Sequence, residues 1–348
     1  MNNILLYVFI FLNIFIAKNL FSFENIYDTQ FYNIEINNEI INDSKIREID
    51  IIKKLSFHNL LKKILSKKNY NKLNKIIKLD DEIDYLIKNI LINDEFISSN
   101  KYKAKIKINF DKKEIINFLR INNINYTDLT SPNFLVVAAE RKNISQAGIS
   151  NDNSFYNAVL PYHFNLINLI YPELSTNDRF IISYEKIINK DIKSLSKIAL
   201  KYNTNNVLIV LLELKNNIYR INISTYSSFS NQIEDISRLN LQLDDNFRDL
   251  IFKELDNWWK EFNLIDNSII NTELCQIKSS NILELHYIND MINTISQIKS
   301  NNIVQIGLNK NINKIVFFGN LNNLIFKLLD KKINLYFNSD NMCIISIS

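Results

Sequence analysis

The sequence predicts an α+β fold built from several small αβ modules in tandem. Stretches with an apolar residue at every second position are typical of strands. They alternate with stretches whose apolar residues recur three and four positions apart, which are typical of amphipathic helices. The chain has 348 residues, of which 47% are hydrophobic and 22% charged, and this is the composition of a globular protein. Such a length allows about two or three domains.

The chain begins with an apolar run at residues 4–17 that only Asn13 interrupts. The run is shorter than the about 20 residues of a membrane-spanning helix, and it fits the core of a secretory signal peptide. We therefore expect residues 1–22 to be a signal peptide that sends the chain to the periplasm. The alternatives are a buried core helix or an uncleaved inner-membrane anchor. Membrane contact is expected only through this segment, if it is uncleaved.

Residues 23–128 are expected to form an N-terminal αβ domain. Its elements are a strand at 30–36, a helix from about 42 to 66, a helix from about 81 to 92, a strand at 101–110 and a short helix at 112–121. The strand at 101–110 places Lys101, Lys103, Lys105 and Lys107 on one face. We expect this lysine row to be solvated and to discourage pairing at a sheet edge. Binding of an anionic envelope component, such as phospholipid headgroups, is the alternative.

Residues 129–268 are expected to form a middle αβ domain. Its elements are a buried strand at 134–139, a helix near 153–163, a strand near 167–171, a helix near 189–202, a hairpin of strands 207–214 and 218–225, a strand at 236–243 and a helix from 245 to about 262. The helix near 189–202 has an apolar face made of Ile192, Leu195, Ile198 and Ala199. The hairpin turn is expected at 215–217, where Asn residues favour a turn.

Two adjacent tryptophans lie near the end of the helix that begins at 245. Neighbouring residues of a helix point about 100° apart, so at most one of the two can be fully buried. We expect Trp258 to pack in the core. Trp259 is then the candidate for contact with a partner or ligand, for example as a stacking platform for a sugar.

Residues 269–348 are expected to form a C-terminal αβ domain. Its elements are a strand at 282–288, a helix from about 291 to 298, strands at 303–308 and 314–318, a helix at 321–328, and strands at 333–337 and 342–347. This order is β-α-β-β-α-β with an extra strand, a ferredoxin-like layout. Cys275 and Cys343 are the only cysteines; they could form one disulfide or remain two buried thiols.

The composition argues against several kinds of chemistry. The chain has three glycines and three histidines, too few for a glycine-rich phosphate loop or a histidine-rich metal site. We therefore expect no cofactor, no metal and no catalytic residues. The acidic clusters at 80–82 and 244–245, and Asp43, each stand at an expected helix start, where capping explains them. The net charge of +4 is too small to suggest nucleic-acid binding.

Several segments resemble, in order, a proteobacterial family of exported proteins catalogued as domain of unknown function 2066. They are KIKINFDKKEIINFLRINNINY (105–126), SPNFLVVAAE (131–140), INLIYPELSTNDR (167–179) and IALKYNTNNVLIVLLEL (198–214). Ser131 replaces an arginine that is usual in the family, and Asn203 replaces a glycine. The family has no established activity, so the resemblance implies no catalytic residues. The middle domain also resembles the N-terminal αβ domain of the Tol-system periplasmic β-propeller protein.

These observations together predict an exported, periplasmic protein that acts without catalysis as an envelope interaction or assembly module. Its expected partner is an envelope protein. The alternative is a periplasmic receptor for a small ligand, such as a glycan or lipid fragment, with a pocket near Gly148–Tyr162 and Glu173–Asp178. The candidate contact residues are Trp259, Tyr162, Glu173 and Asp178. An enzyme is the third hypothesis.

Overall fold

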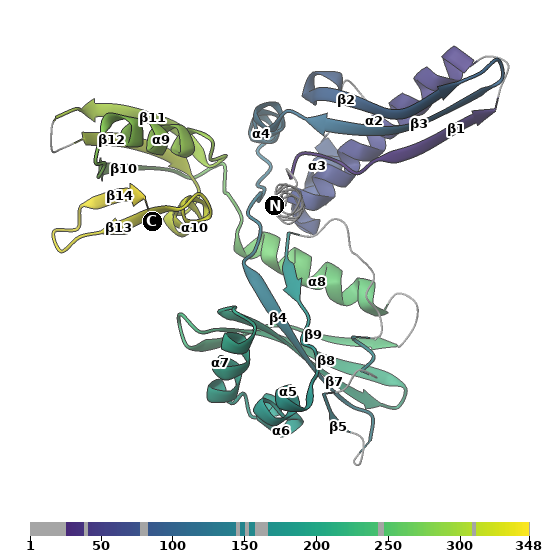
Figure 1. The fold of residues 1–348 in the computed structure, drawn as a ribbon, viewed down its shortest axis with the longest axis vertical. Helices are drawn as coiled ribbons and strands as arrows, with labels where there is room; N and C mark the ends of the chain where they lie inside the picture. The colour runs from purple at the N-terminus through teal and green to yellow at the C-terminus, as the bar shows by residue number, and fades with distance from the viewer. Residues whose placement is uncertain are drawn as a thin grey trace, which may run out of the picture. The chain divides into compact units, whose positions relative to one another are not determined.

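The computed structural model describes residues 26–37, 41–76, 83–143, 147–149, 153–156, 166–242, 247–307 and 311–347 (Figure 1). Helices and strands are mixed along the chain, and the strands form three separate sheets, which confirms the α+β prediction. The chain divides into two compact units. One contains the described residues up to Leu60 and those from 83 to Lys112, and the other contains the rest. Among the described residues, no helix is long and apolar enough to span a membrane. The expected signal peptide lies outside them.

The first unit contains a three-stranded antiparallel sheet in the order β1-β3-β2. Its elements are β1 (Tyr32–Asn37), α2 (Ile41–Ile64, whose last turn belongs to the second unit), a short 3-10 helix (Asp84–Leu86), β2 (Ile87–Ile97) and β3 (Lys101–Phe110). Strand β3 alternates as expected: Tyr102, Ala104, Ile106 and Ile108 are buried. Helix α2 packs on this side, with the rings of Phe57 and Phe110 5.8 Å apart.

Two expectations for this part of the chain are wrong. Apart from the 3-10 turn at Asp84–Leu86, the described part of 81–92 is strand and not helix. Ile90 and Ile92 pair with Ile108 and Ile106 of β3, and their β-branched side chains suit a strand. The second helix is instead α3 (Lys67–Ile76), in the second unit. In addition, β3 is the central strand, so the lysine row cannot protect a sheet edge.

The second unit contains α4 (Lys112–Ile121) and a six-stranded sheet in the order β5-β4-β7-β8-β9, with β6 also paired to β4. The strands are β4 (Asn133–Arg141), β5 (Ala147–Gly148), β6 (Asn168–Ile170), β7 (Asn206–Lys215), β8 (Ile218–Ser227) and β9 (Gln232–Gln242). Strands β4 and β7 are parallel, and both faces of β4 are buried. The hairpin β7–β8 turns at Asn216 and Asn217, both with positive φ, as asparagine tolerates.

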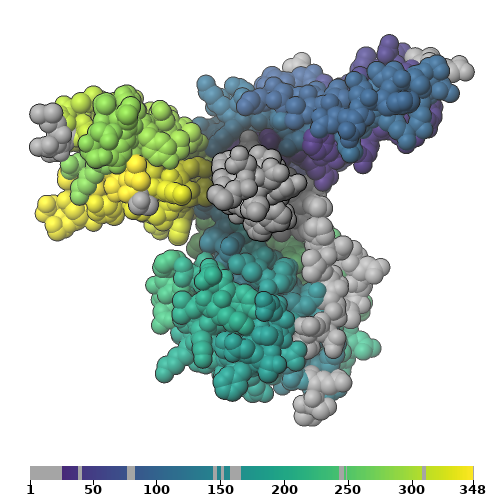
Figure 2. Space-filling model, in the orientation of Figure 1, coloured from purple at the N-terminus to yellow at the C-terminus, as the bar shows by residue number. Residues whose placement is uncertain are grey.

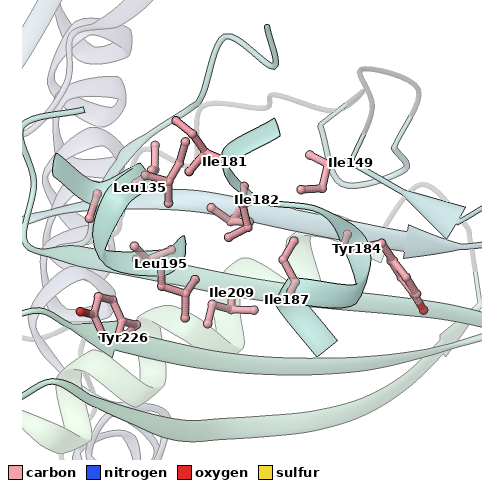
Figure 3. Close-up of a cluster of buried hydrophobic side chains, with 14 of the residues drawn as sticks. Leu135, Ile149, Ile181, Ile182, Tyr184, Ile187, Leu195, Ile209 and Tyr226 are labelled. Atoms are coloured by element: carbon pink, nitrogen blue, oxygen red, sulfur yellow. The ribbon is translucent and has the colours of Figure 1, made fainter. Parts of the chain in front are cut away.

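One face of this sheet is covered by α5 (Thr176–Ile181), α6 (Tyr184–Ile188) and α7 (Ile192–Lys201). Figure 3 shows their apolar side chains directed at Leu135 of β4 and Ile209 of β7. The expected inner face of α7 is confirmed for Leu195, Ile198 and Ala199. Ile192 is exposed instead, because it is the first residue of the helix. Helix α8 (Phe247–Phe262) covers the other face, where Trp258 and Trp259 contact the ring of Phe134.

The C-terminal strands form a five-stranded sheet in the order β11-β12-β10-β14-β13. The elements are β10 (Ile270–Ile277), α9 (Ile282–Asn293), β11 (Ile298–Gln305), β12 (Asn311–Phe318), α10 (Leu321–Asp330), β13 (Ile333–Phe337) and β14 (Cys343–Ile347). The predicted β-α-β-β-α-β order with an extra strand is present. The extra strand β14 inserts between β10 and β13 and runs parallel to β10.

The expected strand at 282–288 is wrong, because these residues form the first turns of α9. The side chain of Asn281 accepts a hydrogen bond from the backbone N–H of Glu284, which caps the helix. Leu285, Ile288 and Ile292 then lie on one buried helical face. The strand that opens the module is β10. Its residues, INTELCQI, do not alternate clearly between apolar and polar, so the sequence did not indicate a strand there.

Candidate functional site

The acidic residue Asp178 stands in the first turn of α5 and is only 2% exposed. Ser175 caps this helix: its hydroxyl accepts a hydrogen bond from the backbone N–H of Asp178, at 3.3 Å. In return, the backbone N–H of Ser175 donates to Oδ2 of Asp178 at 3.0 Å. This reciprocal pair is a capping box, and it fixes the direction of the Asp178 carboxylate.

The end of α7 supplies the other partners of Asp178. Lys201 Nζ lies 2.5 Å from Oδ1, and the hydroxyl of Tyr202 donates to Oδ2 at 2.8 Å. The same hydroxyl accepts a hydrogen bond from the backbone N–H of Glu173 at 2.8 Å. The structure therefore brings the predicted contact residues Glu173 and Asp178 together around Tyr202.

This arrangement keeps Asp178 ionised. Burial raises the pKa of the Asp178 carboxyl, but the hydrogen bonds from Lys201, Tyr202 and Ser175 outweigh it, and the pKa lies below its ordinary value. Both carboxylate oxygens already have donors from the protein. Asp178 is thus suited to clamp α5 to α7 rather than to transfer a proton. The side chain of Glu173 is exposed and leaves that position open to solvent.

The structure reverses the expected roles of the two tryptophans. Trp259 is only 6% exposed, and its indole N–H donates to the carbonyl of Leu129 at 2.8 Å. Trp258 is the half-buried residue of the pair. A buried indole N–H needs a hydrogen-bond acceptor, and the segment before β4 supplies it to Trp259. The sequence did not indicate this contact. Trp259 lies on the α8 face of the sheet, opposite the face that carries Asp178, so surface contact by Trp259 is not supported.

The remaining candidate, Tyr162, lies outside the described residues. So does most of the segment from Gly148 to Tyr162 in which a ligand pocket was expected. Gly148 itself is the last residue of β5, and its half-buried backbone lies beside Glu140 of β4. The described residues thus leave the expected pocket without a complete lining.

A second buried carboxylate, which the sequence analysis missed, lies at the carboxyl end of β4. Oε1 of Glu140 accepts hydrogen bonds from the hydroxyls of Ser154 and Tyr219, at 2.7 and 2.6 Å. Oε2 accepts from the backbone N–H of Ser154 at 3.0 Å. Burial raises the pKa of the Tyr219 hydroxyl, and the bond to Glu140 raises it further. The available sequence signal was a glutamate directly after the apolar run 134–139. The carboxyl ends of parallel strands are frequent ligand sites.

The lysine row of β3 is paired with carboxylates of its neighbours in the first unit. Lys101 and Lys103 lie 2.8 and 3.0 Å from Glu35 of β1. Lys105 lies 2.8 Å from Asp94 of β2, and Lys107 lies 3.5 Å from Asp28. Four positive charges thus face three negative ones, which weakens the case for binding an anionic headgroup on this face.

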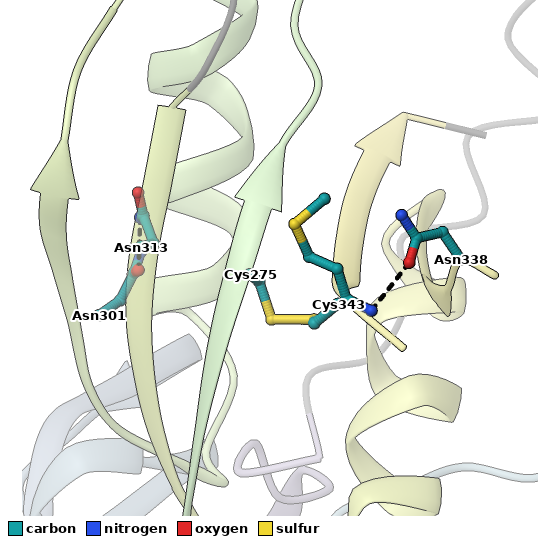
Figure 4. The surroundings of a disulfide bond; sticks show 6 residues. Cys275, Asn301, Asn313, Asn338 and Cys343 are labelled. Carbon is teal, nitrogen blue, oxygen red and sulfur yellow. Dashed lines mark hydrogen bonds between the residues drawn. A yellow bond between two sulfur atoms is a disulfide. The ribbon is translucent and has the colours of Figure 1, made fainter. Parts of the chain in front are cut away.

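Cys275 and Cys343 form a disulfide between the adjacent parallel strands β10 and β14 (Figure 4). They occupy directly paired positions, with Cα atoms 4.5 Å apart, and both are buried in the core beneath α9 and α10. Of the two states that the sequence left open, the structure has the disulfide. Within the described ranges, no group of three or more His, Cys, Asp or Glu side chains could hold a metal ion.

Comparisons with known proteins do not identify the chain. No protein-family model matches it, and no curated protein sequence matches it. The resemblance to domain of unknown function 2066 therefore stays a prediction.

We expect Asp178→Asn to destabilise the protein by about 1.5–3 kcal/mol at pH 7, because an amide replaces a buried carboxylate that accepts hydrogen bonds from Lys201 and Tyr202. The lowered pKa means that the stabilisation is complete above the unfolded-state pKa of about 3.9 and is lost as the pH falls through the folded-state pKa. Urea unfolding of both proteins between pH 7 and pH 2 measures this difference.

The matched control is Asp235→Asn, which removes an exposed carboxylate paired with Lys190 at 2.7 Å. This change should cost less than about 1 kcal/mol at pH 7. Equal effects of the two variants, or an Asp178→Asn effect that does not diminish as the pH falls from 7 to 2, would contradict the clamp assigned to Asp178.

Proposed function

We propose that this chain is an exported, periplasmic protein that acts by binding, as a non-catalytic interaction or assembly module of the cell envelope. The disulfide between Cys275 and Cys343 is the observation that carries the export, because such bonds persist in oxidising compartments. The apolar N-terminal run supports the same location. Fold analogy alone carries no function, so the argument rests on the side chains.

The buried acidic groups favour binding over catalysis. Asp178 and Glu140 are buried carboxylates beside hydroxyl groups, a setting in which an acid–base role has to be considered. Each carboxylate oxygen of these residues accepts hydrogen bonds from the protein itself. A general base must instead reach a substrate proton, and a nucleophile needs a free base beside it. The geometry of both groups therefore favours a structural role.

Exposed apolar side chains of the C-terminal module support a binding role. Ile303 and Val304 on the edge strand β11 are 51% and 60% exposed. Further exposed apolar residues of the same module are Ile282, Leu283, Tyr287, Ile306 and Phe326. Burying such side chains against a partner is favourable, and clusters of them mark interaction surfaces.

The proposed compartment predicts the redox state of the cysteines. When cells are lysed directly into denaturant that contains an alkylating reagent, so that buried positions are exposed, the exported chain should resist thiol alkylation until a reductant is added, because Cys275 and Cys343 are joined. A chain that starts at residue 23 and stays in the cytoplasm should be alkylated at both positions. Cys275→Ser leaves one thiol and serves as the positive control for labelling. Free thiols in the exported wild-type chain would contradict the proposal.

The proposed binding role predicts a stoichiometric envelope partner. Crosslinking of a C-terminally tagged, exported chain, followed by affinity capture and mass spectrometry, should recover one. Ile303→Lys should reduce its recovery, because a charge is then placed within the exposed apolar edge. Gln305→Lys introduces the same charge at an exposed polar position of β11 and should have little effect. A clean preparation without any partner would contradict an interaction module.

A further inference from the structure

Strand β2 is an edge of the sheet in the first unit, with β3 as its only paired neighbour among the described strands (Figure 1). Figure 2 shows the side chains of the chain in the same view. Its central residues are apolar and open to solvent: Leu91 is 41% exposed and Ile92 is 38% exposed. An edge strand offers a row of backbone N–H and C=O groups to any further strand, and natural proteins usually guard such edges with charges or bulges. In β2 the charges stand only at the ends of this central stretch.

The sequence of β2 is self-complementary. Residues 88–94 read Lys-Asn-Ile-Leu-Ile-Asn-Asp, and the five central residues are the same in both directions about Leu91. In an antiparallel pair of two such strands centred on Leu91, Ile90 faces Ile92 and Asn89 faces Asn93. Lys88 and Asp94 flank the palindrome at its two ends, so this pairing brings Lys88 of each strand near Asp94 of the other. β-branched pairs directly across a sheet and nearby opposite charges are both stabilising.

The regular part of β2 coincides with this palindrome. Residues Asn89 to Asn93 pair in unbroken register with Asn109 to Lys105 of β3. The register is interrupted immediately outside, between Ile87 and Asn89 and between Asn93 and Phe96. Such bulges bend a strand and increase its twist. They limit the straight, pairable edge to the self-complementary residues and so disfavour other registers.

We propose that β2 pairs with β2 of a second copy of this chain, antiparallel and centred on Leu91, to form a continuous six-stranded sheet across a two-fold axis. The contact is isologous, since each copy contributes the same residues. Ile90 and Ile92 of both copies would extend the apolar layer of Ile106 and Ile108. The carboxylate of Asp94 also lies 2.8 Å from Lys105 of its own copy. It would therefore interact with both that lysine and Lys88 of the other copy.

The interface is short, so the dimer is expected to be weak and reversible. It depends on neither export nor an envelope partner, and its test is independent of the proposed function. The palindrome and the opposite charges that flank it are complementary to themselves in an antiparallel pair, which favours a second copy as the occupant of this edge.

A cysteine scan tests the register directly. The two native cysteines are joined, so an introduced cysteine is the only free thiol. In the purified full chain under mild oxidation, Leu91→Cys should form a covalent dimer. Asn89→Cys and Asn93→Cys should each stay monomeric alone and crosslink when mixed, because those positions face each other only across the axis. Ile303→Cys, on the edge of another sheet, is the control and should not crosslink.

Sedimentation velocity supplies the second measurement. The wild-type chain should shift from monomer toward dimer as its concentration rises. Leu91→Lys should remain monomeric over the same range, whereas the control Ile303→Lys should dimerise like the wild type. The proposal is overturned by a wild-type chain that stays monomeric, by a dimer that survives Leu91→Lys, or by crosslinking of Asn89→Cys with itself. Crosslinking of Ile303→Cys as strong as that of Leu91→Cys would also overturn it.

Discussion

The cost of burying a carboxylate is the constraint on which much of this structure depends. An ionised group loses several kcal/mol of hydration when it enters the interior, and only charged partners and hydrogen bonds offset the loss. For Asp128, the lost hydration is offset by an ion pair with Lys327 of α10 and by a hydrogen bond that its carboxylate accepts from the Ser296 hydroxyl at 2.7 Å. Asp256 pairs with Lys260, one turn further along α8, and Lys260 also donates to the carbonyl of Lys62 at the end of α2. Burial lowers the pKa of the Lys260 ammonium and raises the pKa of the Asp256 carboxyl. The charge of each group opposes the shift of the other, so each helps to keep its partner ionised.

These pairs connect segments that are distant in the sequence, and they also decide where function can lie. The pair of Asp128 with Lys327 joins the segment before β4 to the C-terminal module, and Asp178 with Lys201 joins two helices of the middle sheet. Because the protein itself supplies the partners of Asp128 and Asp178, these two carboxylates are committed to structure. The apolar side chains left exposed on the edge strands β2 and β11 are the features that such a role does not explain.

Local patterns predicted much of the fold. Strand β3, helix α4 and strand β13 begin and end where the alternation and helical spacing indicated. The predictions failed where tertiary contacts decide between two readings of the same residues. Residues 282–288 alternate like a strand, yet the Asn281 cap and a buried face make them helical. Of the site, the sequence indicated Asp178 but not its partners Lys201 and Tyr202, because a contact across 23 residues leaves no local pattern. The burial of Trp259 depends on the carbonyl of Leu129, which is distant in the sequence, so it could not be predicted from local patterns either.

Hydrogen–deuterium exchange, compared between the exported chain alone and the complex captured from the envelope, separates binding at exposed strand edges from binding at the buried polar clusters. If the edges bind and the clusters only support them, exchange should slow on binding at the exposed apolar edges, foremost at residues 298–307. It should not change at 173–178 or 201–202. Protection concentrated at 173–178 and 201–202, with the strand edges unchanged, would contradict binding at the edges and would assign binding to the Asp178 cluster.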